Sequence, residues 1–178
     1  MNVLLINGSP RKKGNTTAAI AAVKSGLPAE YRVEVIDVID LNIKGCINCD
    51  GCKRNGGNCV LPDDGAWFMC KVAAADLIVF GSPVYWWGIS GQLKMALDKF
   101  YSRDEEFHQT PKKIGIIAIG AADTGDPEYH LISGQFKCIA DYLGWKVVLD
   151  ESICAAAQND VANNPALTDR LKARASEL

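Results

Sequence analysis

A run of small, hydroxylated and basic residues near the N-terminus has the chemistry to hold a phosphate group. Residues 9–17 read Ser-Pro-Arg-Lys-Lys-Gly-Asn-Thr-Thr and lie between a short apolar stretch and a segment of helical period. Amides at a helix start bind anions, and the hydroxyls of Ser9, Thr16 and Thr17 can donate to phosphate oxygens. The guanidinium of Arg11 can add a charged, bidentate hydrogen bond to the phosphate. Helix capping in an exposed basic loop explains part of this set, but not all of it.

The same loop departs from two common nucleotide-binding patterns. Gly8 and Gly14 are one residue too far apart for a nucleoside-triphosphate loop, and Asn15 stands where that loop needs lysine. The G-x-G-x-x-G pattern of dinucleotide-binding folds is missing. The sequence therefore predicts a phosphate site of another kind.

Four cysteines form a second group with possible chemistry. Cys46, Cys49, Cys52 and Cys59 give C-x2-C-x2-C-x6-C in a loop at 45–60 that is rich in glycine and asparagine. Four thiolates at this spacing can hold one iron-sulfur cluster. Zinc is an alternative, although structural zinc sites more often separate two C-x-x-C pairs by about a dozen residues or more. Disulfides or unused thiols are the remaining interpretation.

The other cysteines and the two histidines carry a weaker signal. Cys70, Cys138 and Cys154 are isolated, and we expect them to be semi-buried. His108 and His130 lie near predicted helix ends, where solvated histidines are commoner than reactive ones. No arrangement of a nucleophile with a general base is evident, and so no catalytic side chain is predicted.

Two further loops could lie against a flat ligand. In the segment 83–88, Pro83 stiffens the turn and Gly88 allows close approach of a planar ring. The three consecutive aromatic residues in it cannot all face one core, so at least one should be exposed, or covered by a ligand or a second subunit. The segment 120–125 is built of small residues, a weak signal by itself.

The segments around these loops predict an α/β fold. Short apolar runs alternate with longer runs of helical period, as in β-α-β units. The predicted strands are Val3–Asn7, Val33–Asp37, Leu77–Gly81, Ile114–Ile119 and Lys146–Leu149. The predicted helices are Thr16–Gly26 capped by Asn15, one after Asp64 with Trp67, Cys70 and Ala74 facing inward, Ser90–Phe100, Tyr129–Leu143 and Pro165–Glu177.

Five alternating strands best fit a flavodoxin-like three-layer sandwich with a parallel sheet in the order 2-1-3-4-5. The 178 residues suit one domain, 1–178, with the cysteine-rich loop inserted in it. In such sheets ligands bind outside the carboxyl ends of the strands at the topological switch point. The loops after the first, third and fourth strands are therefore the expected site.

Several motifs together resemble one known family. Asn7–Arg11 followed by Gly14–Thr16, the segment Gly81–Trp86 and the segment Gly91–Lys99 are similar to motifs of the NADPH-dependent FMN reductases and iron-sulfur flavoproteins. The resemblance covers about residues 1 to 150.

The resemblance implies FMN as cofactor, with NAD(P)H as co-substrate, and it implies a [4Fe-4S] cluster on Cys46, Cys49, Cys52 and Cys59. In the family the flavin lies at a subunit boundary, and backbone groups of Val84 and Tyr85 would meet its edge. The cofactor-binding residues expected from the motifs and the loops are Ser9, Arg11, Gly14, Asn15, Thr16, Thr17, Pro83, Val84, Tyr85, Trp86, Trp87, Gly88, Gly120, Ala121 and Asp123.

Three functions follow as hypotheses. The first is an FMN-dependent oxidoreductase that passes electrons from NAD(P)H to a flavin, a quinone or another small acceptor. The second is an iron-sulfur flavoprotein that exchanges single electrons with a ferredoxin-like protein. The third, which is not an enzyme, is a structural zinc-binding module. A phospho-acceptor signalling domain needs acidic residues at the end of the first strand, where Ile6-Asn7-Gly8 stands instead.

The charge and hydropathy of the chain limit the kinds of partner that it is expected to bind. Nineteen Lys and Arg against 21 Asp and Glu give a formal charge of −2 without long runs of one sign, which argues against nucleic acid or an anionic membrane as partner. No apolar run approaches the roughly 20 residues of a membrane helix, and no signal-peptide pattern opens the chain. We expect a cytoplasmic homodimer or homotetramer.

Overall fold

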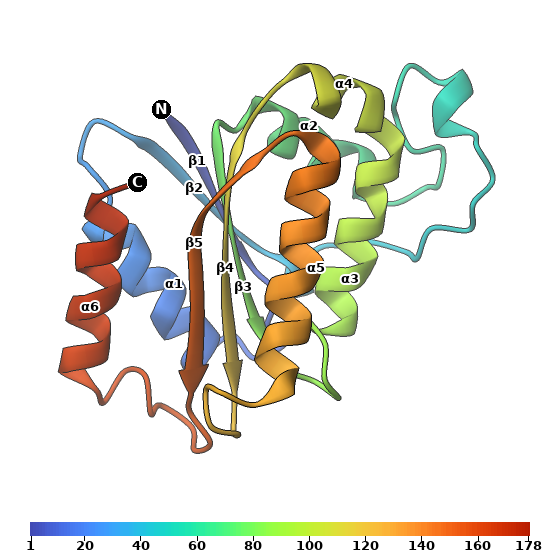
Figure 1. Cartoon of the computed structure of the whole chain (residues 1–178). Coiled ribbons are helices and arrows are strands. Elements are labelled where there is room, and N and C mark those ends of the chain that lie inside the picture. The colour runs from blue at the N-terminus through green and yellow to red at the C-terminus, as the bar shows by residue number, and fades with distance from the viewer.

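A computed structural model describes residues 1–178 as a central parallel sheet with helices on both faces (Figure 1). The strands are β1 (Asn2–Asn7), β2 (Arg32–Asp37), β3 (Leu77–Pro83), β4 (Lys113–Gly120) and β5 (Lys146–Cys154). The helices are α1 (Asn15–Gly26), α2 (Gly65–Ala74), α3 (Gly91–Asp98), α4 (Asp104–Gln109), α5 (Pro127–Leu143) and α6 (Pro165–Ser176). Three short 3-10 helices are η1 (Val38–Asp40), η2 (Cys52–Arg54) and η3 (Lys99–Arg103).

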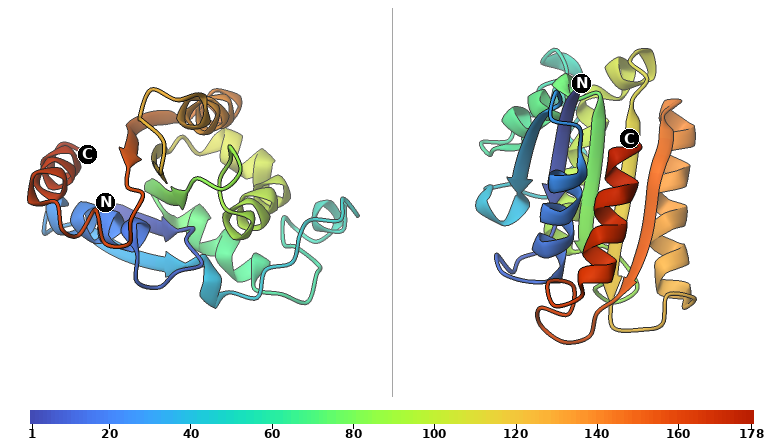
Figure 2. Two further views of the ribbon diagram at one scale, coloured as in Figure 1. Left: turned by 90° about the horizontal axis from the view of Figure 1, so that it is seen from below. Right: turned by 90° about the vertical axis from the view of Figure 1, so that its left-hand side faces the viewer.

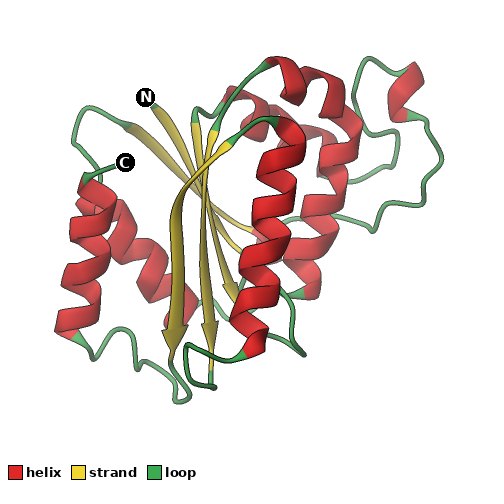
Figure 3. Ribbon diagram, viewed as in Figure 1, coloured by secondary structure: helices red, strands yellow, loops and turns green.

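The sheet order is β2-β1-β3-β4-β5, and every neighbouring pair is parallel. The predicted flavodoxin-like three-layer sandwich is thus confirmed. Its central strands are buried on both faces, which explains why they read as unbroken apolar runs. Helices α1 and α6 cover one face of the sheet, and α2 to α5 cover the other (Figure 3).

The observed strands are longer than the predicted ones at their polar ends. The largest difference is β5, which runs on through Asp150 and Glu151 to Cys154. This is an edge strand whose acidic side chains pair with neighbouring helices: Asp150 with Lys137 of α5, and Glu151 with Arg170 of α6. Charged residues ended the predicted strand because their partners lie far away in the sequence.

The inward face predicted for α2 was wrong. Trp67, Cys70 and Ala74 are exposed, whereas Phe68 and Met69 are fully buried. Nearly every residue of this helix is apolar, so spacing alone could not choose between its faces. The short helix α4 was not predicted at all.

The carboxyl ends of the five strands meet at the lower edge of Figure 1, and Figure 2 (left) looks onto that edge. The loops that follow β1, β3, β4 and β5 gather there. The cysteine-rich loop projects instead from the opposite end of the molecule, beside η3 and α4 (teal in Figure 1). No helix is both long and apolar enough to cross a lipid bilayer.

Candidate functional site

The loop after β1 is held by the side chain of Asn7, the last residue of that strand. Its Nδ2 donates to Asp37 Oδ1 at 2.6 Å and to Thr17 Oγ1 at 3.1 Å, and its Oδ1 accepts from the Ser9 amide at 3.1 Å. Asn7 is 1% exposed. This buried amide ties together β1, β2 and the start of α1, so it fixes where the loop ends and the helix begins.

The start of α1 offers free hydrogen-bond donors. Its N-cap is Gly14, and no side chain caps the helix. The amides of Asn15, Thr16 and Thr17 have no protein acceptor, as expected for an uncapped first turn. Thr16 is 3% exposed, yet its hydroxyl makes no hydrogen bond to the protein. The arrangement can bind an anion such as a phosphate.

Asn15 does not cap this helix, contrary to the prediction. Its Nδ2 donates to the carbonyls of Ala157 at 2.9 Å and Ala155 at 3.3 Å, and its Oδ1 accepts from the Val161 amide at 3.1 Å. The side chain therefore anchors the loop after β5 to α1. Because these partners are some 140 residues away, nothing in the local sequence could indicate the role.

The basic residues of this loop differ in whether a carboxylate pairs with them. Lys12 pairs with Asp40 at 2.5 Å, and the hydrogen bond and charge of Asp40 raise the pKa of Lys12. Arg11 is exposed and forms no ion pair. Its guanidinium is available to an incoming anion.

The loop after β3 is a tight turn with an unusual backbone. The Tyr85 amide donates to Gly88 O at 2.8 Å, and the Gly88 amide donates to Tyr85 O at 3.2 Å. Trp86 and Trp87 between them have φ angles of 50° and 62°, in the left-handed region that side chains rarely adopt. They are 91% and 54% exposed, which confirms that at least one aromatic residue of this loop faces outward.

The loop after β4 is fixed from below by Tyr129 of α5. The phenol oxygen lies 3.0 Å from Ala122 O and 3.1 Å from Ile153 O, so it can bond to the loop after β4 and to the end of strand β5. Burial raises the pKa of Tyr129 to about 12 and keeps it a neutral donor. At Gly120 a Cβ atom would lie 2.4 Å from Glu128 Oε1 and 2.9 Å from the Tyr129 oxygen, so a side chain there would force the Glu128 carboxylate and the Tyr129 phenol to move.

These loops enclose a cavity of about 140 Å³ at the carboxyl edge of the sheet. Ten of the predicted cofactor-binding residues line it: Ser9, Arg11, Gly14, Asn15, Thr16, Pro83, Val84, Tyr85, Gly120 and Ala121. Five do not: Thr17, Trp86, Trp87, Gly88 and Asp123. Thr17 is engaged by Asn7, and the two tryptophans are exposed to solvent.

One wall of this cavity was not predicted from the sequence. Residues 155–158, Ala-Ala-Ala-Gln, complete its lining after β5. Their side chains have little chemistry of their own, so residue type gave no signal. Only the length of β5 and the anchoring by Asn15 bring this segment to the site.

The cysteine-rich loop forms a separate small cavity of about 20 Å³, lined by all four of its cysteines. Cys52 is buried, Cys59 is half-buried, and Cys46 and Cys49 are exposed. Every cysteine is a free thiol, and no three His, Cys, Asp or Glu side chains are arranged to hold a metal ion. The donor types suit a thiolate-bound group, but the four sulfurs are not preassembled around it.

The far wall of this cysteine cavity comes from α3 and η3. Lys99 Nζ lies 2.9 Å from Asp63 Oδ2 and 3.5 Å from Cys59 Sγ. Burial alone would lower the pKa of Lys99, but the hydrogen bonds and charges of Asp63 and Cys59 together outweigh it and raise that pKa. Burial alone would likewise raise the pKa of Asp63, and the hydrogen bonds from Lys99 and two backbone amides lower it instead. The pair is therefore ionised inside the protein.

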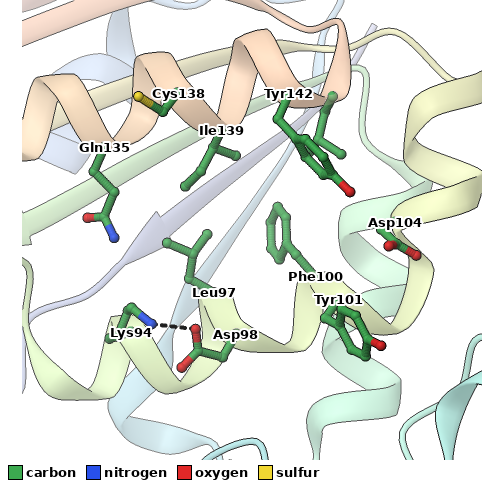
Figure 4. Close-up of a pocket in the computed structure, with 11 residues that line it drawn as sticks. Lys94, Leu97, Asp98, Phe100, Tyr101, Asp104, Gln135, Cys138, Ile139 and Tyr142 are labelled. Atoms are coloured by element: carbon green, nitrogen blue, oxygen red, sulfur yellow. Dashed lines mark hydrogen bonds and ion pairs between the residues drawn. The ribbon is translucent and has the colours of Figure 1, made fainter. Parts of the chain in front are cut away.

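A larger cavity of about 440 Å³ lies between α3 and α5 (Figure 4). Leu97, Phe100 and Ile139 give it an apolar floor, and Lys94 at its rim is paired with Asp98 at 2.5 Å. None of the predicted site residues line it.

Cys138 on its wall is exposed, as are Cys70 and Cys154, so the expectation that these three are semi-buried was wrong. Both histidines are exposed, as predicted.

The fold and this edge define a class of protein: a flavodoxin-like α/β domain with an open helix N-terminus at the switch point of its sheet. The chain belongs to the NADPH-dependent FMN reductase family, whose sequence model matches residues 1–160. The resemblance found in the motifs is thereby confirmed.

Individual relatives carry two kinds of name. An iron-sulfur flavoprotein of Methanocaldococcus jannaschii is 37% identical over 129 residues, which are 72% of this chain and 66% of that protein. A Bacillus subtilis protein that bears the name of an NAD(P)H-dependent FMN-containing oxidoreductase is 26% identical over 155 residues, 81% of this chain and 80% of that one. The matches span 48%, 58% and 66% of the length of three iron-sulfur flavoproteins, so this chain covers less than two thirds of those relatives.

Solved structures agree on the fold. An NAD(P)H:quinone oxidoreductase from Methanothermobacter marburgensis superposes with a TM-score of 0.73 at 16% identity, covering 98% of this chain and 95% of that one. At this identity the likeness concerns the fold alone.

Proposed function

We propose that this protein is an FMN-dependent oxidoreductase that takes electrons from NAD(P)H and passes them to a small acceptor such as a flavin or a quinone. The observation that carries the proposal is the uncapped start of α1, whose free amides and unpaired Thr16 hydroxyl face a cavity at the carboxyl edge of the sheet. Membership of the FMN reductase family supports FMN as the ligand.

The phosphate of FMN would bind at this helix start. The amides of Asn15, Thr16 and Thr17 would donate to it, together with the hydroxyls of Ser9 and Thr16. Arg11 would add the charged contact, since no carboxylate occupies it. A dianionic phosphate suits this donor set because no carboxylate lines the cavity to repel it.

The flavin ring would lie toward the loops after β3 and β4. Pro83, Val84 and Tyr85 line one side of the cavity, and Gly120 and Ala121 line another. The cavity is smaller than the roughly 300–1,000 Å³ of most small-molecule sites, so a flavin would extend beyond it. The exposed part of the ring would then be accessible to a second reactant, as successive hydride donors and acceptors require.

Bound FMN would supply the redox chemistry, accepting a hydride and releasing electrons singly or in pairs. The protein's own residues would bind and orient the flavin and the reactants. No side chain needs to act as nucleophile or base, and none is assigned that role. Trp86 and Trp87, exposed next to Tyr85, would offer flat surfaces to a planar reactant.

Titration of the protein with FMN, followed by quenching of flavin fluorescence, tests the proposed site. Arg11→Gln should raise the Kd about tenfold, since it removes one charged hydrogen bond. Thr16→Val should raise it about 3- to 10-fold through one neutral hydrogen bond. Lys24→Gln, at the exposed far end of the same helix, is the matched control and should bind as wild type does. Equal affinity in all four proteins would contradict the assignment.

An iron-sulfur flavoprotein is the second candidate function. It is supported by the four cysteines that line one cavity and by relatives that bear that name. The chain would then hold a [4Fe-4S] cluster and exchange electrons with a ferredoxin-like protein. Iron content and the visible spectrum of protein purified without oxygen test this: Cys49→Ser should lose iron, whereas Cys138→Ser, on α5, should retain it.

A structural zinc-binding module is the non-enzymatic alternative. It would use the same cysteines and leave the carboxyl-edge cavity without a ligand. Metal analysis that finds zinc in place of iron, together with no uptake of FMN, would favour it over both redox functions.

A further inference from the structure

The wall of the cysteine cavity carries two buried polar side chains that none of the functions above uses. Both come from η3: Lys99 is 2% exposed and Ser102 is 6% exposed, and both line the cavity with the four cysteines. Lys99 donates a hydrogen bond to Cys59 Sγ at 3.5 Å. The 3-10 helix thus places a cation in contact with one of the thiols and a serine in the wall of the same cavity.

The Ser102 hydroxyl has no hydrogen-bond partner. It is one of only two buried side-chain polar groups in the protein that lack one. A buried polar group left unpaired costs about 1–3 kcal/mol, so native proteins rarely keep one without a reason. Its place in the lining of the cysteine cavity indicates an acceptor that binds there.

A second contact, with Asp63, holds Lys99 in place and leaves its ammonium free to donate into the cavity. The ammonium has three protons, of which one goes to Asp63 and one to Cys59. Asp63 also accepts from the amides of Lys44 and Gly65, so its own position is fixed by the backbone. The lysine is therefore a rigidly placed cation beside a metal-ligand type of side chain.

We propose that Lys99 and Ser102 are positioning residues which donate hydrogen bonds to an anionic, thiolate-held cluster bound by Cys46, Cys49, Cys52 and Cys59, and which raise its reduction potential. This rests on the iron-sulfur form of the proposed function. Such groups beyond the ligands are known to orient ligands and to tune the metal centres they surround.

The physical reason is a balance of charge. When the cluster takes up one electron, from reduced flavin in the protein or from dithionite in a test, its negative charge grows by one and no bond or proton is transferred. A buried cation and a hydroxyl donor stabilise the more negative form more than the less negative one. Removing either donor should make the reduction harder.

A redox titration of the reconstituted full chain tests this. Wild type, Ser102→Ala, Lys99→Gln and Lys99→Arg are loaded with iron and sulfide, and the midpoint potential of the cluster is followed by its visible absorption and its electron paramagnetic resonance signal. Ser25→Ala, a serine of α1 that bonds only to Ala22 O, is the matched control. Iron, FMN and the thermal midpoint of the iron-free protein are measured for each variant.

We expect a lower potential in Ser102→Ala and Lys99→Gln, a smaller shift in Lys99→Arg, and none in Ser25→Ala. Ser102→Ala decides the matter even if Lys99→Gln does not fold, because removing an unpaired hydroxyl should leave the iron-free protein as stable as before or more so. Iron-loaded variants with the wild-type potential would overturn the inference and leave the cluster standing. A wild-type protein that binds FMN but no iron would overturn the inference and the cluster, and leave the flavin site standing.

Discussion

The hydrogen-bond donors at the candidate site divide into groups that lack a protein partner and groups that already have one. At the start of α1, three amides and the Thr16 hydroxyl are unpaired, whereas Asn7, Asn15 and Thr17 are fully engaged in holding the loops. The groups that would bind a ligand are therefore distinct from the side chains that hold the loops, although Asn15 and Thr17 contribute to both, to the first through their amides and to the second through their side chains. Two predictions follow from the placing residues.

Asn15→Ala should loosen the loop after β5 from α1. The change removes one acceptor and two donor contacts and leaves the Val161 amide without its partner, so we expect the free energy of unfolding to fall by about 1–3 kcal/mol. FMN affinity should fall as well, since residues 155–158 line the cavity. Urea unfolding measures the first effect. Asn163→Ala, an exposed asparagine, is the control, and equal losses in the two variants would contradict this role.

Tyr129→Phe should destabilise the protein by about 1–2 kcal/mol near neutral pH, because the carbonyls of Ala122 and Ile153 lose their shared donor. The folded pKa of about 12 exceeds the unfolded value near 10. The stabilisation from this shift is therefore complete below pH 10 and is lost as the pH rises toward 12. Thermal unfolding between pH 7 and 11 measures it.

The advantage of wild type over Tyr129→Phe should accordingly be constant up to about pH 9 and shrink above about pH 10. Tyr142→Phe is the control, because that tyrosine is 64% exposed. A difference between wild type and Tyr129→Phe that does not change with pH would show that the phenol proton has no part in stability.

The elements show where local sequence suffices. Amphipathic helices and buried strands were predicted to within a few residues, since their periods are set by their own side chains. Where a helix is apolar all round, as α2 is, the buried face depends on which residues the sheet meets. Helix α4 is six residues long, too short for its period to be recognised.

Adjacent substitutions in α2 test the corrected orientation. Phe68→Ala should cost about 3–5 kcal/mol because the ring is fully buried in the larger core cluster, and its removal leaves a cavity. Trp67→Ala, next to it and 47% exposed, should cost much less in spite of its larger side chain. Denaturant unfolding compares them, and a larger loss for Trp67→Ala would restore the original prediction.

At the scale of the whole molecule, topology explains both the success and the gaps of the sequence prediction. The switch point of a 2-1-3-4-5 sheet directed attention to the loops after β1, β3 and β4, and ten predicted residues meet there. The loop after β5 and the donors of η3 could not be found, because distant contacts alone bring them to their cavities. The two cavities share no residue.

The outward aromatic residues at the carboxyl edge support a proposed homodimer or homotetramer. Trp86 is 91% exposed in a turn with a strained backbone. Burial of its side chain in an interface would offset the free-energy cost of that strain. Trp86→Ser should therefore shift the protein toward monomer in size-exclusion chromatography with light scattering, whereas Trp67→Ser should not. A monomeric wild type would contradict this assembly.

The central claim is that the chain binds FMN and that NAD(P)H reduces it. Its most direct test is the visible absorption spectrum of the FMN-loaded protein, freed of excess flavin and titrated with NADPH or NADH in the absence of oxygen. We expect the flavin bands to bleach as one hydride is delivered per bound FMN, and to return when a quinone is added. Flavin that stays oxidised with both nucleotides, or a protein that retains no flavin, would contradict it.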